Sequence, residues 1–375
     1  MTSTASRREL LIAVNAAPRI SRPAVYRAAQ DLDRWADSGE PPEELANALG
    51  VPRAQMEKAL ASRAGAAVTA AREEEEAARL GACLAVLGDP GYPSGLEQLP
   101  LPPPVLYIWG ELPSAPRVAV VGSRRSDPYG NEVAEVFSRA LAAEGVAVIS
   151  GFARGVDAAA HRGALTAQGG QTVAVLGCGL GVDYPAGHAR LGREIAGRGA
   201  VVTEFPCGLA PRAWHFPVRN RVIAGLASGI LVVQATPRSG SLITARHALD
   251  LGREVWAVPG RIFDERSLGP HALIRDGALL VQHPRDLLDL LLSRTLTGSF
   301  DLLGATGAPL ALPILPKPPG GLPGDILAAL SPGAFEVPED LAGRLGLPLD
   351  RLLGTLMELE LGGWVTRRPG PLYGR

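Results

Sequence analysis

The feature that most constrains this chain is a series of short, fully apolar segments between residues 117 and 260. Val118–Val121 runs into Gly122-Ser123-Arg124-Arg125, and Val146–Ile149 runs into Ser150-Gly151. Apolar strands that are each followed by a helical pattern are typical of a parallel sheet covered on both faces. Ligands of such sheets bind at the carboxyl ends of the strands. Backbone amides, hydroxyls and guanidinium groups collect there in this chain, and such groups hold anions. The sequence therefore predicts a phosphate-binding α/β fold.

Two later segments carry the same kinds of residue. Ser239-Gly240-Ser241 precedes a helical pattern, which places hydroxyls and free amides at a helix N-terminus, where the dipole favours an anion. N-capping by Ser241 explains the same residues equally well. Trp214-His215-Phe216 stands between arginines, and an aromatic ring beside arginines offers a base a stacking face and its backbone a charge. Inward packing of at least one of the two rings is the alternative.

Neither a cofactor nor a metal is expected. A dinucleotide-binding GxGxxG would need glycines where Arg124 and Asp127 stand, and no ribose-binding acid follows the second strand. The six histidines are isolated and form no ligand pair. Asp157 is interpreted as a helix cap rather than a catalytic acid. Spacing alone does not exclude a Ser–His–Asp set, although the chain has no GxSxG elbow.

Length and composition indicate a globular protein of two to four domains. The 375 residues are 46% hydrophobic and 20% charged, and without a run of eighteen apolar residues we expect no membrane span. The N-terminus lacks the features of a signal peptide. Cys83, Cys178 and Cys207 are odd in number and form no CxxC, so we expect no disulfide or zinc finger and a cytoplasmic location.

Basic charge is concentrated in the predicted sheet region. Residues 117–254 contain 15 arginines and 10 acids, whereas the segments on either side carry more acids than bases. This distribution favours a polyanionic partner. Ordinary surface arginine is the alternative explanation for the charge by itself.

The order of patterns predicts several domains. Residues 1–80 form a small helical domain, residues 81–292 the α/β domain, residues 293–323 a linker rich in proline and glycine, and residues 324–375 three helices and a hairpin, the order of a winged helix. We expect the first domain to contain helices over Glu9–Asn15, Arg22–Trp35, Pro42–Leu49 and Arg53–Arg79. Strand-like pieces at Cys83–Leu87 and Val105–Trp109 form an extended lead-in. The sheet follows with strands near 118–122, 146–150, 172–177, 200–204, 230–234 and 255–258, and helices near 130–144, 156–168, 188–197, 219–227, 241–252 and 284–292.

Taken together, the turns resemble those of the DNA-processing protein A family, also called DprA or Smf. The resemblance spans about residues 85–290 in sequential order. It is carried by Val121–Arg124, Ser150–His161, Val175–Gly179, Thr203–Pro206, Phe216–Leu226, Ser239–Ala245, Gly252–Gly260 and Ser267–Ile274.

This resemblance implies a fold and a function. The fold would be an extended Rossmann-like parallel sheet with an N-terminal helical domain of the SAM or helix-hairpin-helix kind and a C-terminal winged helix. The chain would bind single-stranded DNA without hydrolysing it, dimerise through the central domain, and load RecA onto strands covered by single-strand-binding protein in natural transformation and recombination. The family's pocket falls on Gly122, Ser123, Arg124, Arg212 and Phe216, although Ala213 leaves open which residue supplies the pocket's cation.

The predicted DNA-binding set combines this pocket with the other strand-end turns. It comprises Gly122, Ser123, Arg124, Arg125, Ser150, Gly151, Arg154, Gly155, Arg212, His215, Phe216, Arg219, Asn220, Arg221, Ser239, Gly240 and Ser241.

Two other functions remain open. Nucleotide-cleaving enzymes of the lysine-decarboxylase-like class share this kind of Rossmann domain but carry a PGGxGT turn, where this chain has Pro259-Gly260-Arg261-Ile262. A transcription regulator would read DNA through the C-terminal unit. The helix at Leu349–Leu361, however, contains one arginine and three acids, which is a poor groove-reading face.

Overall fold

The computed structural model describes residues 7–17, 25–26, 29, 63–297, 320–330, 335–361, 365–368 and 372–374. The chain divides into two compact units, Met1–Ala311 and Leu312–Arg375, and each is described by itself. The domain boundaries expected from the sequence stay predictions.

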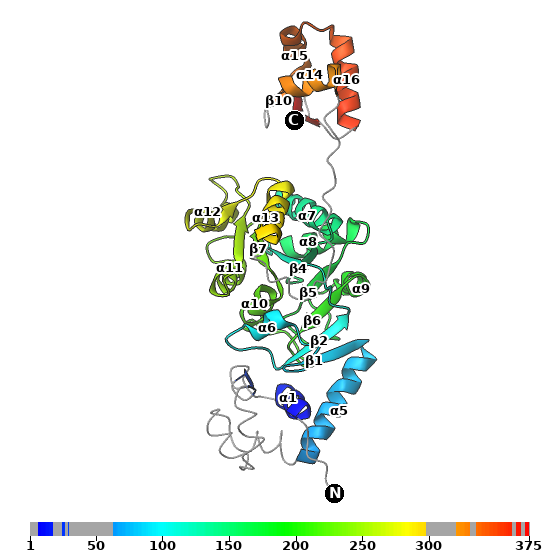
Figure 1. Ribbon diagram of the computed structural model, residues 1–375, viewed down its shortest axis with the longest axis vertical. Helices are drawn as coiled ribbons and strands as arrows, with labels where there is room; N and C mark the ends of the chain where they lie inside the picture. Colours follow the sequence, from blue (N-terminus) through cyan, green and yellow to red (C-terminus); the bar gives the residue numbers. More distant parts are fainter. Residues whose placement is uncertain are drawn as a thin grey trace. The chain divides into compact units, whose positions relative to one another are not determined.

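A nine-stranded sheet organises the first unit (Figure 1). The strand order is β1-β2-β6-β5-β4-β3-β7-β8-β9. Across the sheet, each neighbouring pair in the run β6-β5-β4-β3-β7-β8-β9 is parallel, whereas β2 pairs antiparallel with both β1 and β6. The strands are β1 (Ala82–Val86), β2 (Val105–Gly110), β3 (Arg117–Val121), β4 (Ala147–Ser150), β5 (Thr172–Val175), β6 (Ala200–Thr203), β7 (Gly229–Val232), β8 (Glu254–Ala257) and β9 (Leu279–Leu280).

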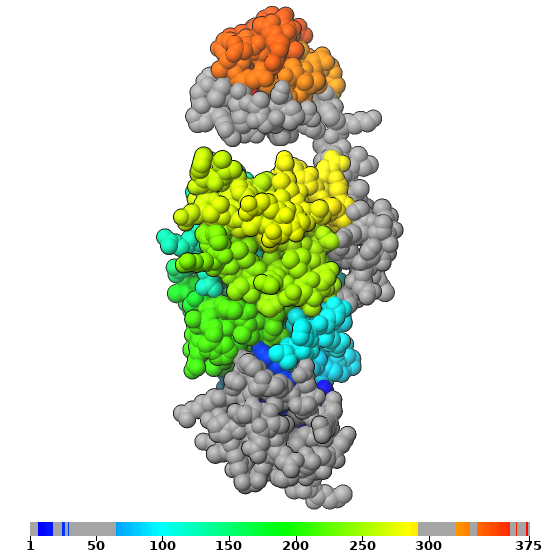
Figure 2. Space-filling view, turned by 90° about the vertical axis from the view of Figure 1, so that its left-hand side faces the viewer, coloured from blue at the N-terminus to red at the C-terminus, as the bar shows by residue number. Residues whose placement is uncertain are grey.

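Helices cover both faces of this sheet, as the uniformly apolar strands require. Successive residues of β3 serve different layers: Val118 and Val120 belong to one core cluster, and Ala119 and Val121 to another. The first cluster lies under α7 (Pro128–Ala143), α8 (Val156–Thr166) and α13 (Pro284–Thr297); the second lies under α6 (Ser94–Glu97), α10 (His215–Leu226) and α11 (Gly240–Asp250). The remaining helices are α9 (Ala189–Ala196), η1 (Glu265–Ser267) and α12 (Leu268–Arg275). In the space-filling view the cyan, green and yellow segments of this unit adjoin one another as one packed body (Figure 2).

Two N-terminal helices pack on the antiparallel edge of the sheet. Side chains of α1 (Arg7–Ala16) and α5 (Arg63–Arg79) share a core cluster with β1, β2 and α9. Buried Asn15 donates to the backbone oxygen of Glu204 at 3.3 Å, which ties α1 to the end of β6. The helices predicted at Arg22–Trp35 and Pro42–Leu49 lie outside the described residues, apart from a few helical positions in the first.

The second unit contains three helices and a three-stranded sheet. The helices α14 (Leu322–Ala329), α15 (Pro338–Leu345) and α16 (Leu349–Leu361) enclose a core that includes Ile326, Leu341 and Leu356. The sheet has the order β10-β12-β11, from β10 (Phe335–Glu336), β11 (Thr366–Arg368) and β12 (Leu372–Gly374). This arrangement confirms the predicted winged helix.

The structure departs from the sequence prediction at several elements. The pieces at 83–87 and 105–109 are not a lead-in but full antiparallel members of the sheet. The helix expected at 219–227 begins at His215, and α13 continues to Thr297, inside the predicted linker. α12 and β9 were not predicted as elements.

Among helices of the described residues, none combines the length and apolarity that crossing a membrane requires.

Candidate nucleic-acid interface

The strand order places a switch point between β3 and β7. From β3 the chain proceeds through β4 and β5 to β6 on one side, then returns to β7 and proceeds to β8 and β9 on the other. The connections after β3 and β7 therefore diverge, and they leave a crevice at the carboxyl ends of the two strands. The backbone N–H of Ser123, after β3, donates to the carbonyl oxygen of Gln234, after β7, at 2.6 Å.

A cleft of about 1430 Å³ opens at this point. Six arginines and three acids line it, so its wall carries a net positive charge. The lining combines 11 of the predicted DNA-binding residues: Gly122, Ser123, Arg124, Arg125, Arg212, Phe216, Arg219, Asn220, Ser239, Gly240 and Ser241.

An aromatic ring and a guanidinium lie face to face in the cleft. The Cζ atom of Arg124 lies 4.5 Å from the centroid of the Phe216 ring. The other neighbour is Tyr184, whose ring centroid is 5.4 Å from that of Phe216. Gly177, just after β5, makes room for this ring, because a Cβ there would lie 2.7 Å from the Cδ1 of Phe216. An aromatic ring and a forked cation thus occur in contact within the cleft, and this pair suits a base next to its phosphate.

The cleft offers unpaired cations. Arg124, Arg125 and Arg212 are exposed, and none of them forms an ion pair with another residue of the described ranges. Ser123 shapes the turn that carries two of them, since its Oγ accepts from the backbone N–H of Arg125 at 3.0 Å. These guanidinium groups can donate forked hydrogen bonds to a phosphate without first breaking an internal ion pair.

A serine pair lies at the start of α11. Ser239, and not Ser241 as predicted, is the N-cap. Its Oγ accepts from the N–H of Ser241 at 3.4 Å and lies 2.7 Å from the Oγ of Ser241. Asn220 donates to the carbonyl of Gly240 at 2.9 Å and fixes this turn against α10. Capping and exposure to the cleft coexist here, because both serines also line it.

Buried polar groups form the floor. Arg219 is 3% exposed and donates to the carbonyls of Gly151, at 2.5 Å, and Val175. Burial lowers its pKa to about 10, with Asp157 opposing the shift, so the group stays charged at neutral pH. Burial likewise raises the pKa of Asp157, which Arg219 opposes. Gly151 cannot carry a side chain, because its Cβ would lie 2.6 Å from a carboxylate oxygen of Asp157. Arg219 and Gly151 therefore brace the cleft from beneath.

Six of the predicted residues do not line the cleft. Gly151 lies in the floor; Ser150 is buried and donates to the carbonyl of Val120 at 2.7 Å. Gly155 has a φ of 79° and allows the Ser123 carbonyl to approach, which then accepts from the first N–H of α8. Arg154 is exposed but outside the lining.

His215 and Arg221 are engaged elsewhere. The His215 ring is buried and stacks on Phe205 with centroids 4.3 Å apart. Arg221 makes an ion pair with Glu204 at 2.5 Å, donates to the carbonyl of Leu101, and lies 4.4 Å from the Tyr26 ring centroid. Arg221 thus connects α10 to the N-terminal part of the unit. These contacts give it a structural role that needs no DNA.

Several lining residues were missed by the sequence analysis: Tyr184, Thr236, Arg261, Phe263 and Arg266. Three of them follow β8 directly. The rule that ligands bind at strand carboxyl ends applies to β8 as it does to β3 and would have found them.

No cluster of three or more metal-ligating side chains occurs among the described residues.

The fold and cleft define an open α/β protein with a positively charged cleft at its switch point. The sequence profile described as DNA recombination-mediator protein A matches residues 83–292, and that of the DprA winged helix domain matches residues 312–371. The chain belongs to the DprA family.

Named relatives agree with this assignment. Protein Smf of Escherichia coli is 43% identical over 273 residues, which cover 72% of this chain and 71% of the relative. DNA processing protein DprA of Streptococcus pneumoniae is 44% identical over 202 residues, covering 53% and 71% respectively. The crystal structure of the Streptococcus pneumoniae protein is similar with a TM-score of 0.66 at 32% identity, over 76% of this chain and 98% of that one. DNA processing protein A of Helicobacter pylori is similar with a TM-score of 0.51 at 28% identity, over 56% and 96%.

Proposed function

We propose that the cleft at the β3–β7 switch point binds single-stranded DNA. The observation that carries this proposal is the Arg124 guanidinium lying 4.5 Å over the Phe216 ring, inside a cleft where arginines outnumber acids. The ring offers a stacking face to a base, and the exposed arginines offer donors to successive phosphates. The similar Helicobacter pylori protein is described as having a single-stranded DNA binding mode, which supports the assignment.

Single strands fit this cleft better than duplexes. A base stacks on Phe216 only if its own face is free, and in a duplex that face is covered by the neighbouring pairs. Affinity should fall with added salt, because phosphate contacts release counterions, and log K for single strands falls with a slope of about −0.7 per phosphate contacted. Titration of a labelled oligothymidylate at several salt concentrations measures this slope. A slope near zero would contradict phosphate binding.

The proposed role is that of a binder rather than an enzyme. The carboxylate in the floor, Asp157, accepts from the backbone N–H of Ala153 and lies beside Arg219, which is the environment of a structural acid. The turn after β8 keeps Gly260 but lacks the second glycine and the Gly-Thr pair of the nucleotide-cleaving class. Incubation with nucleoside monophosphates, followed by chromatography for free base, separates the two roles: we expect no release, and release would establish the enzyme.

We further propose that the protein delivers single strands to RecA during recombination and natural transformation, also from DNA covered by single-strand-binding protein. Membership of a family described as recombination mediators supports this role. The protein should accelerate RecA-dependent strand exchange on covered DNA, and Arg124→Ala should abolish the acceleration because delivery requires a bound strand. Normal acceleration by a variant that no longer binds DNA would show that mediation uses protein contacts alone.

A cytoplasmic homodimer is the proposed working form. The edge strand β9 leaves Leu279 and Leu280 exposed at the end of the sheet, away from β3, and an apolar edge of this kind suits a subunit contact. Arg124→Ala should leave the dimer intact by light scattering, since this arginine faces the cleft. A monomeric Arg124→Ala variant would contradict the separation of the two surfaces.

A further inference from the structure

The connection between β8 and η1 carries an aromatic side chain that is almost fully exposed. Phe263 is 96% exposed, and the preceding Ile262 is 71% exposed. Full exposure of a phenylalanine gives up the hydrophobic stabilisation that burial of its ring would supply. Phe263 nevertheless lines the same cleft as Arg124 and Phe216, whereas Ile262 does not.

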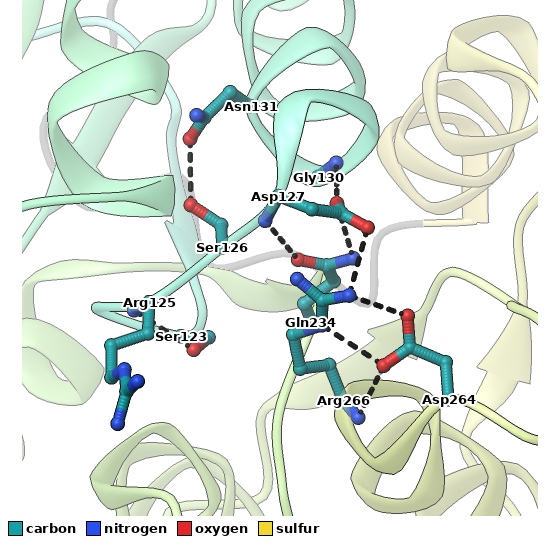
Figure 3. A network of polar contacts seen from close by, with 9 residues as sticks. All are labelled: Ser123, Arg125, Ser126, Asp127, Gly130, Asn131, Gln234, Asp264 and Arg266. Atoms are coloured by element: carbon teal, nitrogen blue, oxygen red, sulfur yellow. Dashed lines mark hydrogen bonds and ion pairs between the residues drawn. The ribbon is translucent and has the colours of Figure 1, made fainter.

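The residues after Phe263 are anchored by a polar network (Figure 3). Arg266 donates to both carboxylate oxygens of Asp264, at 2.9 and 2.8 Å, and lies 3.1 Å from a carboxylate oxygen of Asp127. Gln234, which follows β7, donates to the same Asp127 at 2.9 Å. The connection after β8 is therefore bonded to those after β3 and β7, which carry the proposed phosphate-binding turn.

The residues before Phe263 and the backbone around it are also held. The Gly260 N–H donates to His271 at 3.2 Å, and the Asp264 N–H donates to the Arg261 carbonyl at 3.1 Å, which closes a tight turn over the tip. The Ala235 N–H, after β7, donates to the Arg266 carbonyl at 2.7 Å. A turn with bonds on both sides of its tip presents Phe263 at little further cost in conformational entropy when a ligand arrives.

The chemistry around Phe263 matches that around Phe216. Arg261 is exposed two residues away and lines the cleft, so a ring and a guanidinium again occur together. The two rings come from different elements: Phe216 from the first turn of α10, and Phe263 from the connection after β8. A chain of flat apolar groups linked by anions would use both.

We infer that Phe263 stacks on a second unpaired base of the strand bound in the cleft, with Arg261 contacting an adjacent phosphate. This inference rests on the proposed function and adds a second base-binding position to it. It makes the segment Arg261–Arg266 part of the DNA-binding surface.

The test compares variants of the full chain on two probes. Oligothymidylate supplies bases and phosphates, whereas an oligonucleotide of equal length built from abasic sites supplies phosphates alone. Phe263→Ala should bind oligothymidylate about 5- to 160-fold more weakly than the parent, the range expected for one lost stacking contact. It should bind the abasic probe as the parent does. Phe263→Trp should retain the parent's affinity. Ile262→Ala is the matched control, because it removes apolar surface from an exposed side chain next to Phe263 that does not line the cleft. It should change the affinity for neither probe.

The outcomes separate this inference from the function beneath it. If Arg124→Ala and Phe216→Ala weaken binding and Phe263→Ala does not, the second stacking position is wrong and the function stands. If the parent does not bind oligothymidylate, the function itself fails. If Phe263→Ala weakens binding to both probes equally, its effect does not come from base stacking and the inference is overturned. If it turns a dimer into a monomer by light scattering, Phe263 contacts a second copy of the chain, and the inference is overturned as well.

Discussion

Arg124 and Phe216 depend on each other in the proposed interface. The ring gives the guanidinium a face on which to rest, and the guanidinium remains free of internal ion pairs among the described residues, so it can turn its donors to a phosphate. Gly177 provides the space for the ring, and Ser123 fixes the turn from which Arg124 projects. The interaction with DNA thus uses side chains already placed by the fold.

Removing either side chain should weaken single-strand binding. Arg124→Ala loses charge-assisted hydrogen bonds worth about 1.5–3 kcal/mol each, and Phe216→Ala loses stacking worth about 1–3 kcal/mol per base. Fluorescence anisotropy with an oligothymidylate measures both. Arg139→Ala is the control, because this substitution removes the same charge from an exposed arginine in the later part of α7, which does not line the cleft. Two folded variants with the parent's affinity would show that the strand binds elsewhere.

His161 makes the stability of the first unit depend on pH. Its Nδ1 lies 2.7 Å from the Oγ1 of Thr172. Because the Thr172 hydroxyl donates its own proton to the Val148 carbonyl, Nδ1 carries a proton and donates it to Oγ1. The buried Nε2 has no partner among the described residues. Burial, with a smaller contribution from His188, lowers the pKa of His161 to about 3, so the folded protein keeps the ring neutral.

Acid should therefore destabilise the protein through this histidine. The folded pKa is depressed below the unfolded value of about 6.5, so the unfolded chain binds the proton first, and stability falls as pH drops from about 6.5 towards 3. The slope from one such group is about 1.4 kcal/mol per pH unit. Urea unfolding at pH 7, 6 and 5 should show a shallower slope for His161→Gln than for the parent, and no change for the exposed His283→Gln. Equal slopes in all three proteins would contradict a neutral buried His161.

At the level of elements, the uniformly apolar strands were the most predictable part of the fold. β3 to β8 begin within one residue of the predicted positions. A short apolar run bounded by turn residues is typical of a buried strand of a parallel sheet, so these strands could be predicted from the sequence. α12 was missed because Gly269 and Pro270 suggest a turn, although proline is tolerated in the first turn of a helix. β9 has two residues and no pattern of its own; its pairing with β8 defines it.

The site shows the same limit more sharply. The strand-end rule identified the residues after β3 and β7, but it could not determine helical phase. Arg219 and Arg221 both lie inside α10, where residues two apart point to different sides. Arg219 therefore braces the floor of the cleft, and Arg221 pairs with Glu204. Only tertiary packing decides between such neighbours.

The helix α16 should not read duplex DNA. Its exposed side chains include Leu349, Leu353 and Met357, spaced four residues apart, and its charges are one arginine against three acids. A groove-reading helix needs donors and cations instead. The second unit has its own core, so a polypeptide of residues 312–375 can be tested alone in a gel-shift assay with random-sequence duplex. We expect no shifted band; a salt-resistant shift would indicate a DNA-reading winged helix.

At the scale of the whole molecule, the two compact units should fold separately. The division falls between Ala311 and Leu312, and the core clusters containing β3 to β8 include no residue of the second unit. A chain truncated after Ala311 should stay soluble, keep the parent's thermal transition for the sheet, and retain single-strand binding, because every lining residue of the cleft lies in the first unit. Circular dichroism and anisotropy check these points. Aggregation of the truncated chain would mean that the units share a core.

The central claim is that the cleft binds DNA through unpaired bases. Comparing the affinities for one sequence as a single strand and as a duplex tests this claim most directly. The full chain is titrated with a labelled single strand and, separately, with the same strand annealed to its complement, at one salt concentration. The proposed site predicts much tighter binding of the single strand, and it predicts that Phe216→Ala removes most of that preference, because the preference comes from stacking of an unpaired base. Equal affinity for the duplex, or a preference that Phe216→Ala leaves intact, would contradict the assignment of the cleft.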